Sequence, residues 1–245
     1  LVMGVANDHS IAWGIAKAVS DQGAELAFSY QGEAFGKRVQ PLAASVGSDF
    51  LLDVDVTDDA SLDAAFGAIT ERWGKLDFLL HSVAFAPRED LHARVVDCSA
   101  QGFALAMDVS CHSFIRMTKL AEPLMTEGGC LMTVTFFGAE KVVEHYNMMG
   151  PVKAALESSV RYMAAELGGK GIRVHALSPG AMATRAASGI DRFDELLART
   201  AERAPTHHLV TVEDIGPCAA FLASDAARQL TGLTLYIDGG YHIVG

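Results

Sequence analysis

Residues 4–14 read GVANDHSIAWG and follow the apolar run LVM at residues 1–3. A short strand, a turn and a helix start of this kind can place a helix N-terminus against the pyrophosphate of a dinucleotide. We expect Gly4 to open the turn, Ser10 to cap the helix, and Gly14 to let the helix pack closely on a sheet. The spacing does not fit the standard G-x-G-x-x-G fingerprint, so an ordinary strand, loop and helix remains the alternative.

Short apolar segments alternate with longer segments of helical periodicity along the rest of the chain. Apolar strands without alternation indicate burial on both faces, which predicts a parallel sheet between two helix layers. The expected fold class is α/β: a single-domain Rossmann fold over residues 1–245, a doubly wound parallel sheet of about seven strands with helices on both faces. We expect a substrate-covering loop and helix at about residues 179–205. The predicted strands are 1–5, 25–30, 49–56, 77–84, 130–137, 172–178 and 233–238, and the predicted helices are 11–22, 33–46, 60–72, 101–125, 147–167, 193–203 and 212–224.

Composition narrows the classes of partner. The chain has 245 residues, half of them apolar, and a net charge of −11, which argues against nucleic acid as the main partner. No apolar run is long enough to span a membrane and no secretory leader stands at residue 1, so we expect no membrane partner. The cysteines are far apart without a CxxC pair, which favours reduced cytosolic thiols over zinc ligands or disulfides. They are Cys98, Cys111, Cys130 and Cys218.

The ends of the second and third predicted strands favour NADH over NADPH. In dinucleotide folds the residue at the second strand end meets the adenosine ribose, and an acidic residue there selects NAD. Here that residue is Gln31, which is neutral and can form hydrogen bonds with ribose hydroxyls. No Lys or Arg follows until Lys37, so nothing obvious would neutralise a 2′-phosphate. Asp55 and Val56 could hold the adenine. The alternatives are that Gln31 is a polar turn residue and that Asp55 caps the next helix.

A tyrosine and a lysine stand seven residues apart in HYNMMGPVK, residues 145–153. An α-helix turns about 100° per residue, so a spacing of seven returns to one face roughly 10 Å along the axis. Met149 occupies the position four residues before the lysine. We therefore expect Tyr146 to reach out from the start of a helix while Lys153 stays at least one turn inside it.

Together these stretches resemble the enoyl-acyl carrier protein reductases of bacterial fatty-acid synthesis, a divergent branch of the short-chain dehydrogenase/reductase superfamily. The resemblance covers essentially the whole chain. It rests on GVANDHSIAWGIA, ELAFSYQ, DVDVTDD, HSVAFAP, YNMMG-x-x-K, AASGI at residues 186–190 and DGG at residues 238–240. In the ordinary superfamily a tyrosine stands where Met149 is, and a serine stands where Phe136 is. Both hydroxyls of a carbonyl-reducing site are thus replaced here.

The resemblance implies a cytoplasmic homotetramer that passes a hydride from NADH to the β-carbon of a trans-2-enoyl thioester, on acyl carrier protein or on coenzyme A in vitro. It implies that Tyr146 donates a hydrogen bond to the thioester oxygen, and that Lys153 holds the nicotinamide ribose and favours tyrosinate character nearby. Carried over by position, the cofactor contacts are Gly4, Ser10, Ile11, Gln31, Asp55, Val56, Val83, Lys153, Met182, Ala183, Thr184, Arg185 and Ala186. The substrate contacts are Ala86, Phe136, Tyr146, Met149 and Phe193. No metal is implied.

The chain departs from the family pattern at three places. Phe136 replaces the family's second tyrosine, SPGAM at residues 178–182 replaces the usual Ser-Ala-Gly-Pro-Ile, and Pro151 lies early in the active-site helix. Two other functions stay open: a carbonyl or hydroxyacyl oxidoreductase of the ordinary superfamily type, and a paralogue that binds NADH with little turnover.

Overall fold

The computed structural model describes residues 1–182 and 193–244. Within these ranges the strands form one seven-stranded parallel sheet in the order β3-β2-β1-β4-β5-β6-β7. The order reverses between β1 and β4, which makes the sheet doubly wound and places a crevice outside the carboxyl ends of these two strands. The predicted fold class is confirmed. The strands are β1 (Val2–Met3), β2 (Ala27–Tyr30), β3 (Phe50–Asp53), β4 (Phe78–His81), β5 (Gly129–Val134), β6 (Ile172–Pro179) and β7 (Thr234–Ile237).

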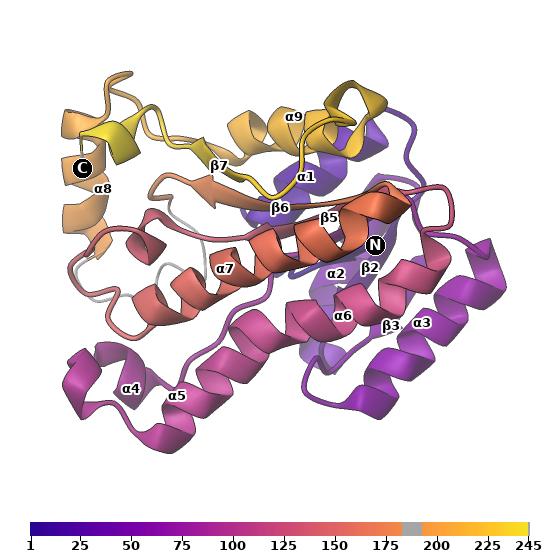
Figure 1. Cartoon of the computed structure of the whole chain (residues 1–245), viewed down its shortest axis with the longest axis horizontal. Coiled ribbons are helices and arrows are strands. Elements are labelled where there is room, and N and C mark those ends of the chain that lie inside the picture. The colour runs from indigo at the N-terminus through magenta and orange to yellow at the C-terminus, as the bar shows by residue number, and fades with distance from the viewer. Residues whose placement is uncertain (183–192, 245) are drawn as a thin grey trace.

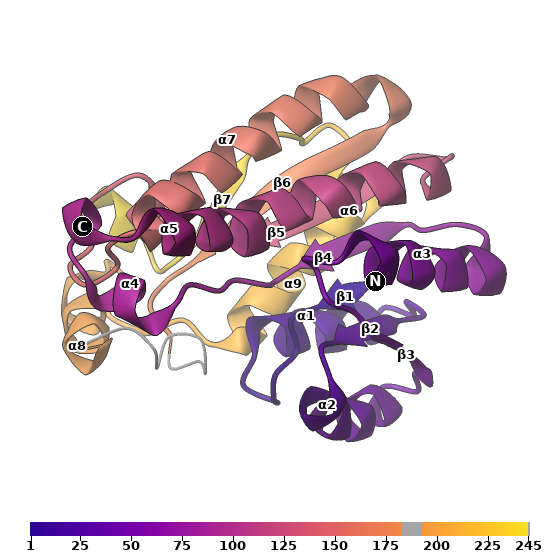
Figure 2. The ribbon, with the colours of Figure 1, turned by 90° about the horizontal axis from the view of Figure 1, so that it is seen from below.

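Helices cover both faces of the sheet, as Figures 1 and 2 show from two directions. One layer contains α1 (Ile11–Ser20), α2 (Glu33–Ser45) and α9 (Val212–Ala223). The other contains α3 (Asp59–Trp73), α5 (Ala100–Met107), α6 (Ser113–Ala121) and α7 (Met149–Leu167). The short helix α4 (Arg88–His92) and α8 (Phe193–Arg203) lie at the end of the molecule where α7 begins.

The strands are apolar throughout because each face of the sheet has its own core. Along β4, Leu79 joins the cluster beneath α3, α6 and α7, whereas Phe78 and Leu80 join the cluster beneath α1 and α9. All three side chains are buried. The structure therefore explains why the sequence showed no polar alternation in this strand. Among the described helices, none combines the length and the hydrophobicity needed to cross a bilayer.

The long helix predicted over residues 101–125 is interrupted. A π-helical turn, η2 (Asp108–His112), separates α5 from α6, and a 3₁₀ turn, η3 (Glu122–Leu124), follows α6. The Ser110 hydroxyl lies at the interruption: it accepts from the Phe85 amide at 2.9 Å and donates to the Phe85 carbonyl at 3.0 Å. Because a π turn adds one residue without breaking the apolar pattern, periodicity alone predicted a continuous helix. The helix α4 was not predicted either.

Gly14 lies where α1 crosses α9, and the expectation that it packs on the sheet is wrong. A Cβ atom built on Gly14 would lie 2.5 Å from the carbonyl oxygen of Val212. In the other direction, a Cβ on Gly216 of α9 would lie 2.6 Å from the carbonyl oxygen of Gly14. The two glycines thus bring the helix backbones into direct contact, which a larger side chain on either would prevent.

The substitution Gly14→Ala should destabilise the fold by about 1–3 kcal/mol, because the new methyl group overpacks the α1–α9 contact. The matched control is Gly67→Ala in α3, where a Cβ meets no atom within 4 Å. This control should be neutral or stabilising by up to about 1 kcal/mol, since alanine is the better helix former. Urea unfolding of both variants measures the difference, and equal midpoints would contradict the packing argument.

Candidate active site

The turn after β1 is built for a close approach of backbone to backbone. Gly4 has φ +95°, and a Cβ there would lie only 1.9 Å from the carbonyl oxygen of Ser82, so no other residue fits. The Ser10 hydroxyl accepts from the amides of Ala6 at 3.0 Å and Asn7 at 3.1 Å. Ser10 is the N-cap residue of α1 by position, but the expectation that its side chain caps the helix is wrong, because the hydroxyl holds the turn instead.

The first amides of α1, starting at Ile11, point out of the helix end because they have no intrahelical acceptor. With the partial positive charge of the helix N-terminus, this is the geometry that receives a phosphate group. Gly4 lets the turn lie directly against the Ser82 backbone, since the Ser82 carbonyl stands where a side chain at position 4 would be, and this close approach holds the turn beside the helix N-terminus. The residues present therefore fit a dinucleotide pyrophosphate at this place.

Gln31 and Asp55 come together at the neighbouring ends of β2 and β3. The Asp55 carboxylate accepts from the Thr57 amide at 2.8 Å and from the Thr57 hydroxyl at 2.7 Å. These bonds, and a further one from Gln31, hold the pKa of Asp55 below its usual value. The alternative that Asp55 caps the next helix is wrong, because Asp58 is the N-cap of α3 and accepts from the Ala60 amide at 3.0 Å.

The other predicted cofactor residues follow further strands at the same edge of the sheet. Val56 is buried after β3, Val83 is half-buried after β4, and Met182 is buried after β6. With the turn after β1 and the Gln31–Asp55 pair, they lie along the carboxyl edge of the sheet on both sides of the strand-order reversal. Four predicted contacts lie outside the described residues: Ala183, Thr184, Arg185 and Ala186.

Lys153 lies in the first half of α7, and only 6% of it is exposed. Its ammonium donates to the carbonyl oxygen of Val134, at the end of β5, over 2.7 Å. Burial lowers the pKa of Lys153 to about 8, against the opposing charges of Cys111 and Glu157. Lys153 is therefore not a solvated surface lysine, and its side chain is a buried cation beside the crevice.

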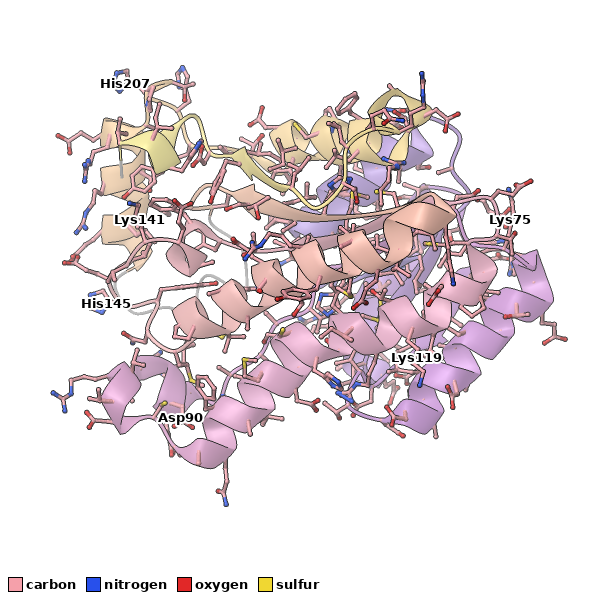
Figure 3. All side chains as sticks on the ribbon, viewed as in Figure 1. Lys75, Asp90, Lys119, Lys141, His145 and His207 are labelled. Carbon is pink, nitrogen blue, oxygen red and sulfur yellow. The ribbon has the colours of Figure 1, made fainter. Side chains whose placement is uncertain are left out.

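Tyr146 lies in the turn before α7, which begins at Met149, two residues later than predicted. The residues on either side of it have left-handed backbones, His145 with φ 65° and Asn147 with φ 44°. The Asn147 amide group donates to the Leu91 carbonyl at the end of α4, over 2.8 Å. Figure 3 shows His145 on this turn, at the end of the molecule that carries α8. The position of Tyr146 is thus set by a strained turn and not by helix periodicity.

An apolar cluster surrounds Tyr146 and unites four of the five predicted substrate residues. Ala86, Phe136 and Met149 all pack in the same cluster as Tyr146, which is 8% exposed. The Phe136 and Tyr146 rings meet edge to face, with centroids 4.9 Å apart. The fifth, Phe193, begins α8, and its side chain lies outside what the structure describes.

The Tyr146 hydroxyl is held in its protonated form. Burial, and after it the nearby carboxylate of Glu157, raises the pKa of Tyr146 well above its usual range. The expectation that Lys153 would favour tyrosinate character is therefore wrong, because burial dominates. A phenol that keeps its proton at neutral pH is a hydrogen-bond donor within an apolar site.

Three buried polar residues near this site were not predicted. Thr135 at the end of β5 donates to Glu157 of α7 over 2.7 Å. His81 of β4 lies 3.0 Å from the Thr133 hydroxyl and 2.8 Å from the Ser113 hydroxyl. Two features of the sequence could have indicated these residues: a carboxylate four residues after Lys153, on the same helix face, and a histidine inside an apolar strand.

The cysteines are free, as predicted, and lie in the described part of the chain. Over residues 1–182 and 193–244, no three His, Cys, Asp or Glu side chains are grouped so that they could hold a metal ion.

The fold and the site together define a class of protein. The structure has a doubly wound sheet, a glycine turn against a helix N-terminus, and a buried tyrosine and lysine beside the crevice. These features are those of a dinucleotide-dependent oxidoreductase of the short-chain dehydrogenase/reductase type.

Comparisons with known proteins give the family within this class. The family model described as enoyl-(acyl carrier protein) reductase matches residues 4–242. The chain is 51% identical to the enoyl-[acyl-carrier-protein] reductase [NADH] 2 of Rhizobium meliloti, over 99% of this chain and 91% of that protein. The chain therefore belongs to the enoyl-acyl carrier protein reductase family.

Solved structures agree. An enoyl-acyl carrier protein reductase from Anaplasma phagocytophilum in complex with NAD superposes with a TM-score of 0.96 at 49% identity, covering 99% of this chain and 93% of that one. The Bacillus cereus enoyl-acyl carrier protein reductase with NADP⁺ and indole naphthyridinone gives a TM-score of 0.97 at 44% identity, covering 100% and 96%.

The substitution Gly138→Ala should impair turnover while leaving the fold intact. A Cβ at Gly138 would lie 2.4 Å from Cδ1 of Tyr146, so the ring must move away from its place against Phe136. A displacement of about 1 Å at a reacting group can cost on the order of 10²-fold in kcat. The control is Gly168→Ala, where a Cβ meets no atom within 4 Å. Unchanged kcat for the Gly138 variant in NADH oxidation would show that the ring position does not matter.

Proposed function

We infer that this chain reduces the trans-2 double bond of an enoyl thioester with NADH, in the elongation of fatty acids on acyl carrier protein. The observation that carries this inference is the buried, protonated Tyr146 packed against Phe136 and Met149. A carbonyl reductase would need hydroxyl groups where those two apolar residues stand. The relatives and solved structures named above carry the same activity in their names.

The residues present suit the chemistry of this reaction. When bound, NADH supplies the hydride that is added to the β-carbon of the enoyl thioester. Negative charge then builds on the thioester oxygen, which is three bonds from the carbon that accepts the hydride, two more than in a carbonyl reductase. Tyr146 donates a hydrogen bond to that oxygen, and a donor used mainly in the transition state raises kcat. Lys153 holds the nicotinamide ribose hydroxyls with its buried ammonium.

The neutral edge of the adenosine site supports NADH as the reductant. Gln31 stands at the ribose position, and the first cation after it, Lys37, pairs with Glu33 at 2.7 Å. The guanidinium of Arg38 lies 6.0 Å from the centre of the Phe35 ring. Both cations therefore already have partners on their own helix, away from a 2′-phosphate.

We further propose a cytoplasmic homotetramer with residues 1–245 as one domain. Exposed apolar side chains on the outer surfaces of helices support subunit contacts. They include Leu105 on α5 and Phe221 on α9, with 40% and 46% exposed. Free cysteines support a reducing compartment.

Residues 179–205 would cover the acyl chain. The C-terminal part of this segment, within and just after α8, contacts the turn that carries Tyr146 and the C-terminal residues of the chain. Arg199 of α8 pairs with Glu144 at 2.8 Å, just before Tyr146, and Arg203 donates to the Val244 carbonyl near the C-terminus. Buried Ala204 packs with Phe137 and Tyr241. A cover anchored in this way would transmit its position to the turn that carries Tyr146.

The test is oxidation of NADH with two thioesters. Turnover with crotonyl thioester and none with acetoacetyl thioester is expected, because the hydroxyls that serve carbonyl reduction are replaced at positions 136 and 149. Turnover with acetoacetyl thioester alone would identify a carbonyl reductase. Tight NADH binding without turnover on enoyl thioesters from C4 to C16 would identify a binding paralogue, for which the missing hydroxyl of Phe136 would be the reason.

The substitution Tyr146→Phe should lower kcat for crotonyl thioester on the order of 10²–10³-fold, the usual cost of losing one oxyanion donor. The KM should change little, since the hydrogen bond strengthens mainly in the transition state. Tyr162→Phe, on the exposed side of α7, removes the same hydroxyl away from the site and should behave as wild type. Equal kcat values for the two variants would exclude Tyr146 as the donor.

A further inference from the structure

Glu157 is a buried carboxylate that the proposed reaction does not use. It lies one helical turn after Lys153 on α7, and only 9% of the residue is exposed. Acidic side chains are almost never this buried unless they are paired, because the charged form loses its hydration. The contacts of this carboxylate therefore indicate what it does.

Two consecutive residues at the end of β5 bind two consecutive turns of α7. The Val134 carbonyl accepts from Lys153 over 2.7 Å, and the Thr135 hydroxyl donates to Oε1 of Glu157 over 2.7 Å. On the other side, the Thr135 amide donates to the Leu177 carbonyl of β6 over 2.8 Å. Thr135 is thus fixed from both directions.

The residue after Thr135 is Phe136, whose ring packs edge to face on Tyr146. An anchor on Thr135 therefore determines where the Phe136 ring stands, and the ring in turn bounds the position of the Tyr146 phenol. In this chain Phe136 can act on Tyr146 only by packing, so its placement carries more weight than that of a residue with a hydroxyl of its own.

Glu157 also interacts electrostatically with the buried ammonium of Lys153. Burial lowers the pKa of Lys153 to about 8, while the charges of Cys111 and Glu157 oppose the change. Burial raises the pKa of the Cys111 thiol above its usual value, so that thiol is neutral where Lys153 titrates. The carboxylate of Glu157 is then the anion that keeps the lysine charged.

Other groups act on the same pair and stay constant in the test below. Burial, with a smaller contribution from the charge of Glu140, raises the pKa of Glu157 above its usual value, although the bonds from Thr135 and Thr234 and the charge of Arg161 oppose the change. His81 on β4 is neutral, because burial and the Lys153 charge lower its pKa to about 3. Among residues 1–182 and 193–244, the hydroxyl groups of Thr135, Thr234, Tyr146 and Tyr236 also act on this carboxylate.

We propose that Glu157 is a positioning residue of the active site: its carboxylate fixes Thr135, and thereby the Phe136 ring against Tyr146, and it balances the buried ammonium of Lys153. The proposal rests on the proposed function, in which Lys153 binds NADH and Tyr146 acts on the thioester. The hydrogen bond from Thr135 should affect kcat, and the charge of Glu157 should affect the pH dependence of NADH binding. Different substitutions test the two effects.

The charge is tested by Glu157→Gln, which keeps the shape and the acceptor oxygen. The dissociation constant of NADH is measured by fluorescence from pH 6 to pH 10. Wild-type affinity should fall as the pH rises through about 8, because the ammonium is lost above its lowered pKa. In Glu157→Gln this fall should move to lower pH by about one unit. At pH 8.5 the variant should then bind NADH about eightfold more weakly than wild type.

The matched control for the charge is Glu166→Gln, the same substitution on an exposed part of the same helix. Its affinity profile should coincide with that of wild type. If Glu157→Gln and Glu166→Gln share one profile, the assigned balance of charge is overturned.

The hydrogen bond is tested by Thr135→Val, which removes the hydroxyl and keeps both charges. The kcat for crotonyl thioester should fall about tenfold, the cost of losing a bond to a charged group, while the fall in NADH affinity stays near pH 8. Thr135→Ser restores the hydroxyl and should recover most of kcat. Wild-type kcat in Thr135→Val would overturn the positioning role.

The outcomes separate this proposal from the proposed function. If the wild-type enzyme binds NADH but does not reduce crotonyl thioester, the proposed function is wrong. The role of Glu157 can still be tested in that case, because the pH dependence of NADH binding is measured without turnover. Active wild-type enzyme with unchanged profiles in both variants contradicts the role of Glu157 alone.

Discussion

The burial of one ammonium group constrains the rest of this site. Lys153 has its charge inside the protein, bonded to the Val134 carbonyl at the end of β5. A buried cation is tolerated only where an acceptor and an opposing charge are held in place. The sheet supplies the acceptor and α7 supplies the charge one turn later, at Glu157. These contacts therefore fix the position of α7 relative to the end of β5, beside the crevice.

The second constraint is the space left for the Tyr146 ring. Gly138 leaves no room for a side chain beside the ring, and a Cβ at Gly150 would lie 3.0 Å from the Gly138 carbonyl. The left-handed backbones of His145 and Asn147 are unfavourable by themselves, so surrounding contacts must maintain them. The Asn147 bond to the Leu91 carbonyl and the Glu144–Arg199 pair supply such contacts from α4 and α8. Elements distant in sequence thus converge on one phenol.

Sequence patterns predicted the sheet because apolar strands buried on both faces have few other arrangements. They also predicted that Gly4, Gln31 and Asp55 lie at one edge of the sheet, since each follows a strand and parallel strands end at the same edge. What they missed depends on tertiary contacts. The π turn at η2 retains the apolar pattern of a helix, and the role of Gly14 depends on α9, two hundred residues away in the chain. The pKa of Tyr146 follows from burial that no local pattern reveals.

The spacing of Tyr146 and Lys153 was interpreted with helix geometry, and the structure shows that this geometry applies to the lysine alone. Seven residues of continuous helix would place both side chains on one face about 10 Å apart along the axis. The helix begins only at Met149, so that calculation does not apply to Tyr146. The turn before the helix sets the tyrosine instead, and Met149 fills the helical position nearest the lysine on that face. A donor placed by a turn can move independently of the helix that carries the lysine. The distance between the two groups can therefore change in evolution through residues 143–148 without disturbing the buried ammonium.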